Sequence, residues 1–289
     1  MNTLTIKTPA KINLFLSVLG KRPDGYHDVE MLMQMVSLYD EVTVERTESD
    51  IRIFSDTATL PLGKENTAWK AAAEILSVYG KQAGLTVTIK KNIPVAAGLA
   101  GGSGNAAAVL AAANKLLDIG LDRQQLAAIG TKIGMDVPFF FFGPTAHAQG
   151  RGEILTSLPP VPMCSIILVN PGFETSTAWV YKNVNLRLTK KALCNKIPRI
   201  SVHDIVTGLH NDLETVTKIA HPVINTIEEA LTAQGALGVL MSGSGPTVFG
   251  VFENETACQS AAEKLFSRGW LIYPVVTLTE SPFREYLPR

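Results

Sequence analysis

Residues 94–107 have the composition of an anion-binding loop: Pro-Val-Ala-Ala-Gly-Leu-Ala-Gly-Gly-Ser-Gly-Asn-Ala-Ala. Gly98, Gly101, Gly102 and Gly104 allow a backbone with positive φ and a close approach of a ligand. The alanine-rich stretch that follows predicts a helix. The first N–H groups of a helix are unpaired and lie at the positive end of its dipole. Because phosphate is the usual anion at such a site, the segment predicts nucleotide chemistry.

Two familiar phosphate motifs fit this loop poorly. The sequence has no Gly-x-x-x-x-Gly-Lys-[Ser/Thr] run, which excludes a P-loop NTPase. Gly102, Gly104 and Ala107 match the relaxed Gly-x-Gly-x-x-Ala pattern of dinucleotide-binding folds. Those folds also need an acidic residue after a second strand, about 20 positions on. Asp118 and Asp122 instead fall at the end of one expected helix and the start of the next, so a dinucleotide is the weaker alternative.

Polar residues outside the loop have plain structural explanations when they are taken singly. Lys11 and Asn13 lie two residues apart, so they share one face of an expected strand. A lysine there could simply discourage edge-to-edge sheet pairing. Pro138 disfavours helix at the residue before it, which puts Asp136 in an exposed turn at the end of a helix.

Four further segments carry turn or cap signals. Residues 20–25 (Gly-Lys-Arg-Pro-Asp-Gly) are typical of a solvated hairpin tip, which accounts less well for the Tyr-His pair at 26–27. Residues 150–153 (Gly-Arg-Gly-Glu) predict a hairpin turn, and residues 242–247 (Ser-Gly-Ser-Gly-Pro-Thr) a glycine-rich turn between strands. Residues 211–214 (Asn-Asp-Leu-Glu) fit a helix N-cap with Glu at N3. None of these segments identifies a function alone.

Composition narrows the class of protein. The 289 residues include 26 Lys and Arg and 26 Asp and Glu, so charge gives no reason to expect nucleic acid or a membrane as a partner. The five histidines show no metal-ligand spacing, and no Gly-x-Ser-x-Gly elbow occurs. Three cysteines (Cys164, Cys194, Cys258) are too few and too scattered for a disulfide framework. With no signal peptide and no apolar run of about 18 residues, we expect a soluble, cytoplasmic protein.

The elements that must position these residues divide the chain near Pro159, Pro160 and Pro162. Before this point the patterns predict short strands and helices, with the strand at 85–90 leading into the glycine loop. After it, strands and helices alternate in an order that predicts an antiparallel, ferredoxin-like sheet. The strands are expected at 4–7, 12–18, 29–36, 41–46, 51–54, 85–90, 165–169, 239–241, 246–252 and 271–277, and the helices at 66–79, 106–117, 122–133, 175–183, 201–209, 222–234 and 258–267.

Taken in order, the segments resemble the GHMP kinases, a family of small-molecule kinases with its own glycine loop. Within the family, the match is to the branch that acts on a cytidyl substrate. Seven segments carry the resemblance: residues 9–14, 20–27, 94–107, 136–139, 150–153, 211–214 and 242–247. The resemblance implies a two-domain α+β fold. Residues 1–160 would form a ribosomal-protein-S5-like α/β domain with the phosphate loop, and residues 161–289 a ferredoxin-like domain.

The resemblance also implies roles for individual residues. Asp136 would be the catalytic base, and Lys11 the catalytic lysine that keeps Asp136 ionised and polarises the substrate hydroxyl. The substrate would lie against Asn13, Tyr26, His27, Thr177 and Tyr181, with Tyr181 completing an aromatic sandwich around the base. The ATP phosphates would lie in the loop formed by Pro94, Val95, Ala96, Ala97, Gly98, Leu99, Ala100, Gly101, Gly102, Ser103 and Gly104.

The implied reaction is ATP-dependent phosphorylation of the 2-hydroxyl of 4-diphosphocytidyl-2-C-methyl-D-erythritol, in non-mevalonate isoprenoid precursor biosynthesis. Mg²⁺ would bridge phosphate oxygens, with ligands that the sequence does not identify. The protein would act as a monomer or homodimer. Another GHMP small-molecule kinase and a catalytically silent nucleotide-binding homologue are the alternatives. The loop departs from the family at Gly104, where a serine is usual, and the lost hydroxyl would remove one candidate phosphate or Mg²⁺ ligand.

Overall fold

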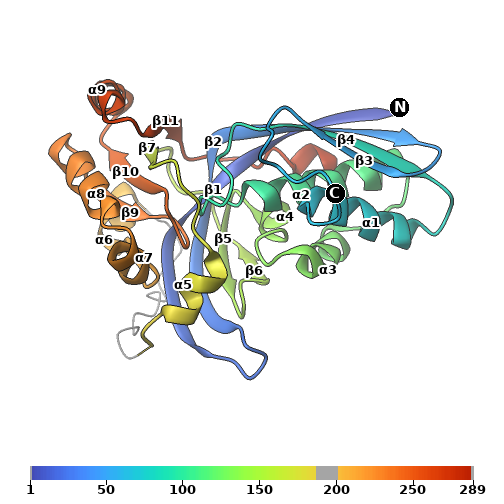
Figure 1. Ribbon diagram of the computed structural model, residues 1–289, viewed down its shortest axis with the longest axis horizontal. Helices are drawn as coiled ribbons and strands as arrows, with labels where there is room; N and C mark the ends of the chain where they lie inside the picture. Colours follow the sequence, from blue (N-terminus) through green and yellow to red (C-terminus); the bar gives the residue numbers. More distant parts are fainter. Residues whose placement is uncertain (1, 187–200, 288–289) are drawn as a thin grey trace.

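Two long antiparallel strands form the centre of the molecule (Figure 1). The computed structural model describes residues 2–186 and 201–287. Strand β1 (Thr3–Lys21) pairs with β2 (His27–Thr47) along nearly their whole lengths. The sequence predicted four short strands here, which is wrong. The pairing register shifts after Pro9, Asn13 and Val18, and β1 continues past each shift because a β-bulge lets a strand bend without ending.

The first sheet has seven strands among the described residues. Its main order is β3-β4-β2-β1-β8, and the hairpin β5-β6 attaches to β2. Strand β8 comes from the second half of the chain and pairs in parallel with β1, so this sheet is not built from one half alone. The bounds are β3 Ile51–Ser55, β4 Gly84–Lys90, β5 Thr145–Gln149, β6 Ile154–Ser157 and β8 His210–Asn211.

Four helices belong to the first half: α1 (Thr67–Tyr79), α2 (Gly101–Leu116), α3 (Arg123–Ile133) and the short α4 (Phe139–Phe142). The predicted starts of α1 and α3 are confirmed, since Asn66 caps α1 and Asp122 forms a capping box with Gln125. Helix α2 is buried on almost every side because its small alanines allow close packing against α1, α3, β1 and β2. This packing fixes the N-terminus of α2, where the glycine loop ends.

The second sheet is antiparallel, in the order β11-β7-β10-β9. Its strands are β7 (Ser165–Asn170), β9 (Gly238–Met241), β10 (Val248–Phe252) and β11 (Leu271–Val276), with α8 (Val223–Ala233) and α9 (Glu255–Leu265) as the connecting helices. This strand–helix–strand–strand–helix–strand order is ferredoxin-like, as predicted. Helices α5 (Thr177–Asn183), α6 (Val202–Gly208) and α7 (Glu214–Ala220) lie between β7 and α8 in sequence.

The two halves share their cores. Ile12 and Leu14 of β1 belong to one apolar cluster with Ile166 of β7 and Phe249 of β10. Phe283, near the end of the chain, is completely buried in the core of the first sheet. The predicted division into domains of residues 1–160 and 161–289 therefore stays a prediction.

The remaining composition-based expectations concern cysteines and membrane spans. Cys164 and Cys258 are buried free thiols, and Cys194 lies outside the described residues. Within residues 2–186 and 201–287, no helix combines the length and apolar character needed to cross a bilayer.

Candidate active site

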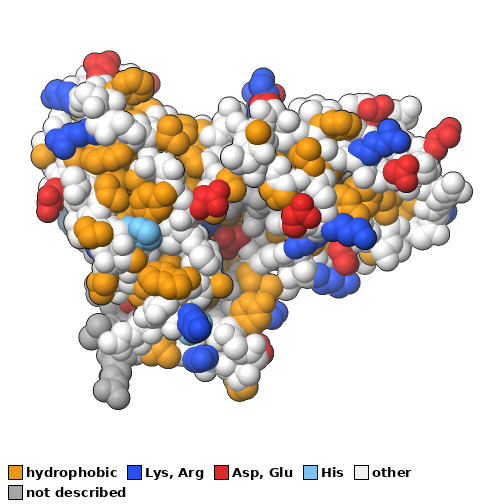
Figure 2. All heavy atoms as spheres, in the orientation of Figure 1, with side chains coloured by type: hydrophobic (Ala, Val, Ile, Leu, Met, Phe, Trp, Pro, Cys, Tyr) orange, Lys and Arg blue, Asp and Glu red, His pale blue; other side chains and the backbone are white. Residues whose placement is uncertain are grey.

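A cavity of about 1090 Å³ lies between the two halves of the molecule. Figure 2 shows this face hollowed near its centre. The lining comes from the glycine loop, from β1 and β2, and from the segments around residues 135, 151, 177 and 243. The volume is at the upper end of the range for a single small ligand, so two ligands could meet within it.

The glycine loop forms one wall of this cavity. It connects β4 to α2, which begins at Gly101. Nine of its eleven predicted phosphate-binding residues line the cavity: Pro94, Val95, Ala96, Ala97, Gly98, Ala100, Gly101, Gly102 and Ser103. Gly98 has a φ of +77°, and a Cβ there would lie 2.1 Å from the carbonyl oxygen of Ser242. Only glycine suits this position, because both the backbone conformation and the close approach exclude a side chain.

Leu99 and Gly104 do not line the cavity, and their predicted contacts with the phosphates stay predictions. Leu99 is buried, and its carbonyl oxygen accepts a 3.0 Å hydrogen bond from the Lys11 N–H. The N–H of Gly104 donates within helix α2 to Ala100. A Cβ at Gly104 would lie 2.3 Å from Thr8 Oγ1, so this position faces β1. A side chain at position 104 would therefore point toward Thr8 and Phe140, not into the cavity.

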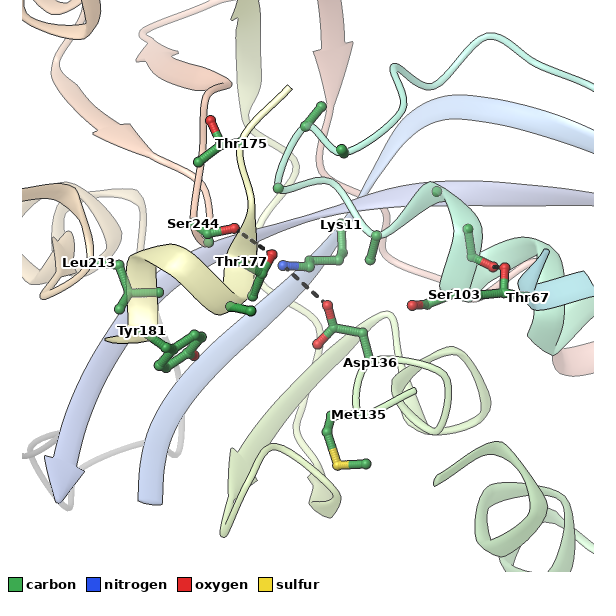
Figure 3. Close-up of a pocket in the computed structure, with 18 of the residues that line it drawn as sticks. Lys11, Thr67, Ser103, Met135, Asp136, Thr175, Thr177, Tyr181, Leu213 and Ser244 are labelled. Atoms are coloured by element: carbon green, nitrogen blue, oxygen red, sulfur yellow. Dashed lines mark hydrogen bonds and ion pairs between the residues drawn. The ribbon is translucent and has the colours of Figure 1, made fainter. Parts of the chain in front are cut away.

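Lys11 and Asp136 meet in the middle of the cavity wall (Figure 3), and Asn13 lines the cavity beside Lys11. Lys11 Nζ donates a 2.6 Å hydrogen bond to Asn13 Oδ1 and lies 3.7 Å from Asp136 Oδ2. The Lys11 side chain is 5% exposed and that of Asp136 is 33% exposed. Burial lowers the pKa of Lys11, and the Asp136 carboxylate opposes that lowering. The pair therefore joins a desolvated cation to a carboxylate that remains open to the cavity.

The glycine-rich turn at 242–247 closes the wall behind Lys11. Ser242 Oγ accepts a 3.3 Å hydrogen bond from the Asn13 N–H and donates a 3.0 Å bond to the Gly98 carbonyl. Asn211 holds this turn, because its Nδ2 donates to the carbonyl oxygens of Met241 and Gly243. Asn211 lies in β8, so its predicted role as an N-cap with Glu at N3 is wrong.

The far end of the cavity carries four of the five predicted substrate residues, Tyr26, His27, Thr177 and Tyr181. The rings of His27 and Tyr181 lie 5.4 Å apart, centroid to centroid, while the Arg151 guanidinium lies 5.0 Å from the Tyr26 ring centroid. Tyr181 thus packs beside His27, and its predicted place in an aromatic sandwich around the base stays a prediction. Thr177 Oγ1 is 2.8 Å from Ser244 Oγ, which links α5 to the 242–247 turn.

Two of these groups have shifted pKa values. Burial and then the Asp136 carboxylate raise the pKa of Tyr181, so its hydroxyl remains a donor at neutral pH. Burial, with a smaller contribution from Lys21, lowers the pKa of His27. Both rings are therefore held in their neutral forms, which suits contact with an uncharged base.

Comparison with known sequences agrees with this geometry. Residues 66–144 match the GHMP kinases N terminal domain, and residues 192–270 match the GHMP kinases C terminal domain. A protein from Pelobacter propionicus described as 4-diphosphocytidyl-2-C-methyl-D-erythritol kinase is 49% identical over 282 residues, or 96% of this chain and the whole of that protein. The chain belongs to the GHMP kinase family.

Other members of the family extend the comparison. A protein of the same description from Geobacter metallireducens is 48% identical over 96% of this GHMP kinase and 100% of its own length. A crystal structure of 4-(cytidine 5'-diphospho)-2C-methyl-D-erythritol kinase has a TM-score of 0.79 at 33% identity, covering 95% of this chain and 99% of that one. A homoserine kinase from Cytophaga hutchinsonii, at 20% identity and a TM-score of 0.74, covers 97% and 96% and shares the fold.

Sequence reasoning missed part of the cavity of this GHMP kinase. Beyond the loop, Thr67 Oγ1 donates a 2.7 Å hydrogen bond to the Gly102 carbonyl. Lys91 Nζ packs against Gly101, where it would lie 2.9 Å from an added Cβ. The other missed lining residues on this side are Leu60, Pro61, Glu65 and Asn66. Lys91 could have been suspected from its place between the strand and the loop. The others belong to no motif and reach the cavity only through the packing of α1 on α2.

Across residues 2–186 and 201–287, no group of three or more His, Cys, Asp and Glu side chains is arranged to hold a metal ion. The side-chain oxygen donors that line the cavity near the loop include the hydroxyls of Ser103 and Thr67 and the carboxylates of Glu65 and Asp136. Such a set fits Mg²⁺, which commonly binds through one or two protein oxygens together with substrate phosphates and water.

Proposed function

We propose that this chain transfers the γ-phosphoryl group of ATP to the 2-hydroxyl of 4-diphosphocytidyl-2-C-methyl-D-erythritol, a step of non-mevalonate isoprenoid precursor biosynthesis. The observation that carries this proposal is the order of groups along the cavity. Ser103 and Thr67 lie on one side of the Lys11–Asp136 pair, and Tyr181 and Leu213 on the other (Figure 3). A phosphate donor in the loop and a cytidyl acceptor at the aromatic end would therefore meet at the pair.

Asp136 would act as the general base. The substrate hydroxyl oxygen attacks the γ-phosphorus, its proton passes to the Asp136 carboxylate, and the bond from that phosphorus to the β,γ-bridging oxygen breaks to release ADP. Proton transfer of this kind requires the acceptor to be open to the substrate. The one-third exposure of the Asp136 side chain into the cavity supports this role.

Lys11 would supply positive charge at the reacting centre. Its ammonium stabilises the ionised Asp136 and the charge that spreads over the transferred phosphoryl oxygens. Because Asn13 Oδ1 and Asp136 Oδ2 hold the ammonium from two sides, it needs no reorganisation when the substrate arrives. The low exposure of Lys11 strengthens this interaction, since water does not screen it.

The loop would bind the ATP phosphates through the first N–H groups of α2, which have no partner within the helix. Mg²⁺, when bound, would neutralise phosphate charge, with Ser103 and Asp136 as candidate protein ligands. Thr67 holds the Gly102 carbonyl and so fixes the loop's last turn. We also propose a cytoplasmic location and a monomeric or homodimeric state, which gel filtration can test.

The experiment is coupled ATP turnover with the cytidyl substrate, with mevalonate and homoserine as alternative acceptors. We expect turnover with the cytidyl substrate alone. Phosphorylation of mevalonate or homoserine without the cytidyl substrate would instead support a different GHMP kinase. No turnover with any acceptor, while ATP still binds, would support a silent homologue.

A further inference from the structure

Arg151 stands out among the residues that line the cavity, because no role described above uses it. It belongs to the turn at 150–153, between β5 and β6. Its guanidinium carbon lies 5.0 Å from the Tyr26 ring centroid, and its side chain is 27% exposed. Cation–aromatic contact of this kind holds a guanidinium in place without using its hydrogen-bond donors.

The turn fixes the backbone position of Arg151. The Val29 N–H donates a 2.8 Å hydrogen bond to the Gly150 carbonyl, which ties the turn to β2. A Cβ at Gly152 would lie 2.9 Å from Met31 Cε and 3.9 Å from Met135 Cβ. Met135 precedes Asp136 in the chain and lies near it in Figure 3. The turn therefore packs beside the reacting centre, while the guanidinium reaches Tyr26 at the aromatic end.

Glu153 orients the guanidinium. Its Oε1 accepts a 3.0 Å hydrogen bond from Arg151 Nε, and its Oε2 accepts a 2.6 Å bond from the Arg151 backbone N–H. Partial burial opposes ionisation of Glu153, but these bonds, with one from its own backbone, lower its pKa. Because Glu153 takes the Nε–H and no other hydrogen bond to the guanidinium is formed within residues 2–186 and 201–287, the two terminal amino groups of Arg151 remain for a ligand.

The negative charges of the two proposed ligands favour a cation at the aromatic end of the cavity. ATP and a cytidine diphosphate are both polyanions, and the glycine loop can serve only one of them. Lys11 is paired with Asp136, and Lys91 with Asp40. The other cations that line the cavity are Lys21, Lys182 and Arg151, and they are all on the substrate side.

We propose that Arg151 recognises the diphosphate of the cytidyl substrate, with Glu153 as its positioning residue. This inference rests on the proposed function. A planar guanidinium can donate two parallel hydrogen bonds to phosphate oxygens, which a lysine ammonium cannot do. In the substrate, the diphosphate joins the base to the alcohol that is phosphorylated. Arg151 likewise lies between Tyr26 at the aromatic end and the turn that packs beside Met135 at the reacting centre.

The test compares Arg151→Met with the wild type. Loss of charge-assisted hydrogen bonds should raise KM for the cytidyl substrate about 10- to 100-fold, with KM for ATP within about twofold. Arg151→Lys should recover only part of the lost affinity, because a lysine restores the positive charge but cannot donate the two parallel hydrogen bonds. Arg123→Met is the matched control, since Arg123 also lies over an aromatic ring, that of Phe142, but outside the cavity. It should leave both KM values unchanged.

Calorimetric binding of cytidine diphosphate and of cytidine separates this inference from the proposed function. Wild type should prefer the diphosphate, and Arg151→Met should lose that preference while binding cytidine as before. This result would support the role of Arg151 even if the wild type failed to phosphorylate the cytidyl substrate. If the folded variant kept both the wild-type KM and the preference for the diphosphate, the inference would be overturned. A wild type that binds cytidine and cytidine diphosphate equally would overturn it as well.

Discussion

Lys11 and Asp136 differ in solvent contact although they lie side by side, and this difference predicts a pH dependence. Burial lowers the pKa of Lys11, and Asp136 counteracts the lowering. As pH rises through that lowered pKa, Lys11 loses its charge, so kcat should fall on the alkaline side below the ordinary lysine pKa of 10.5. The measurement is kcat against pH for the wild type, at saturating ATP and cytidyl substrate.

Removing the carboxylate tests the same pair from the other side. In Asp136→Asn, kcat should fall about 10²- to 10⁴-fold because the base is lost. The alkaline limb of the remaining activity should move to lower pH, since the charge that raised the pKa of Lys11 is gone. Circular dichroism should show an unchanged fold. A folded variant with wild-type turnover would exclude Asp136 as the base.

Gly104 gives a second prediction for a single residue. The Thr8 hydroxyl is buried and has no hydrogen-bond partner in the described part of the chain, and the Phe140 ring also lies 3.1 Å from a Cβ placed at Gly104. Gly104→Ser should therefore lower the free energy of unfolding by about 1 to 3 kcal/mol through overpacking, without raising kcat. Urea unfolding and ATP turnover measure the two effects.

The control for Gly104→Ser is the double variant with Thr8→Ala. Removing the threonine Oγ1, 2.3 Å from the new Cβ, makes room for the serine, so the double variant should regain part of the lost stability. If Gly104→Ser were as stable as wild type and turned over faster, the residue would face the phosphates after all.

At the scale of elements, the loop depends on a buried ion pair where it leaves β4. Lys91 Nζ lies 2.5 Å from Asp40 Oδ2, and these side chains are 4% and 0% exposed. Asp40 Oδ1 also accepts the N–H groups of Asn92 and Ile93, each at 2.8 Å. One carboxylate of β2 therefore fixes the three residues that precede the loop's first proline.

Asp40→Ala should lower the free energy of unfolding by about 3 to 5 kcal/mol, because it leaves the Lys91 charge buried without a partner. The double variant Asp40→Ala/Lys91→Met should regain part of this energy. Glu41→Ala is the matched control: Glu41 is the next residue, its ion pair with Lys7 is exposed, and its loss should cost less than about 1 kcal/mol. Urea unfolding measures all three, and equal costs at Asp40 and Glu41 would contradict this account.

These elements show what the sequence can and cannot predict. Capped helices such as α1 and α3 were predictable because their signals lie within a few residues. The length of β1 was not, since a bulge at Pro9 and a strand end have the same local signal. Lys11 and Asp136 came from the family resemblance, whereas the Tyr181–His27 contact depends on how α5 packs, which no local pattern encodes.

At the scale of the whole molecule, the last part of the chain returns from the second sheet to the first. The Leu278 N–H donates a 2.9 Å hydrogen bond to the Met35 carbonyl, and Gln34 Nε2 donates to the Leu278 carbonyl at 2.9 Å. Phe283 then packs on Phe140 and Phe141, with ring centroids 5.9 and 6.2 Å apart. This segment joins the halves on the side where α2 and the loop are anchored.

Phe283→Ala should therefore lower the free energy of unfolding by about 3 to 5 kcal/mol, since it opens a cavity in the core that supports α2. The unfolding should remain a single transition by far-UV circular dichroism and by tryptophan fluorescence, because the two halves share buried contacts. Phe266→Ala is the control: Phe266 is 76% exposed, so its loss should change stability by less than about 0.5 kcal/mol. If Phe283→Ala produced two separate transitions, residues 1–160 and 161–289 would fold as independent units, and the cavity between them would depend on docking rather than on a shared core.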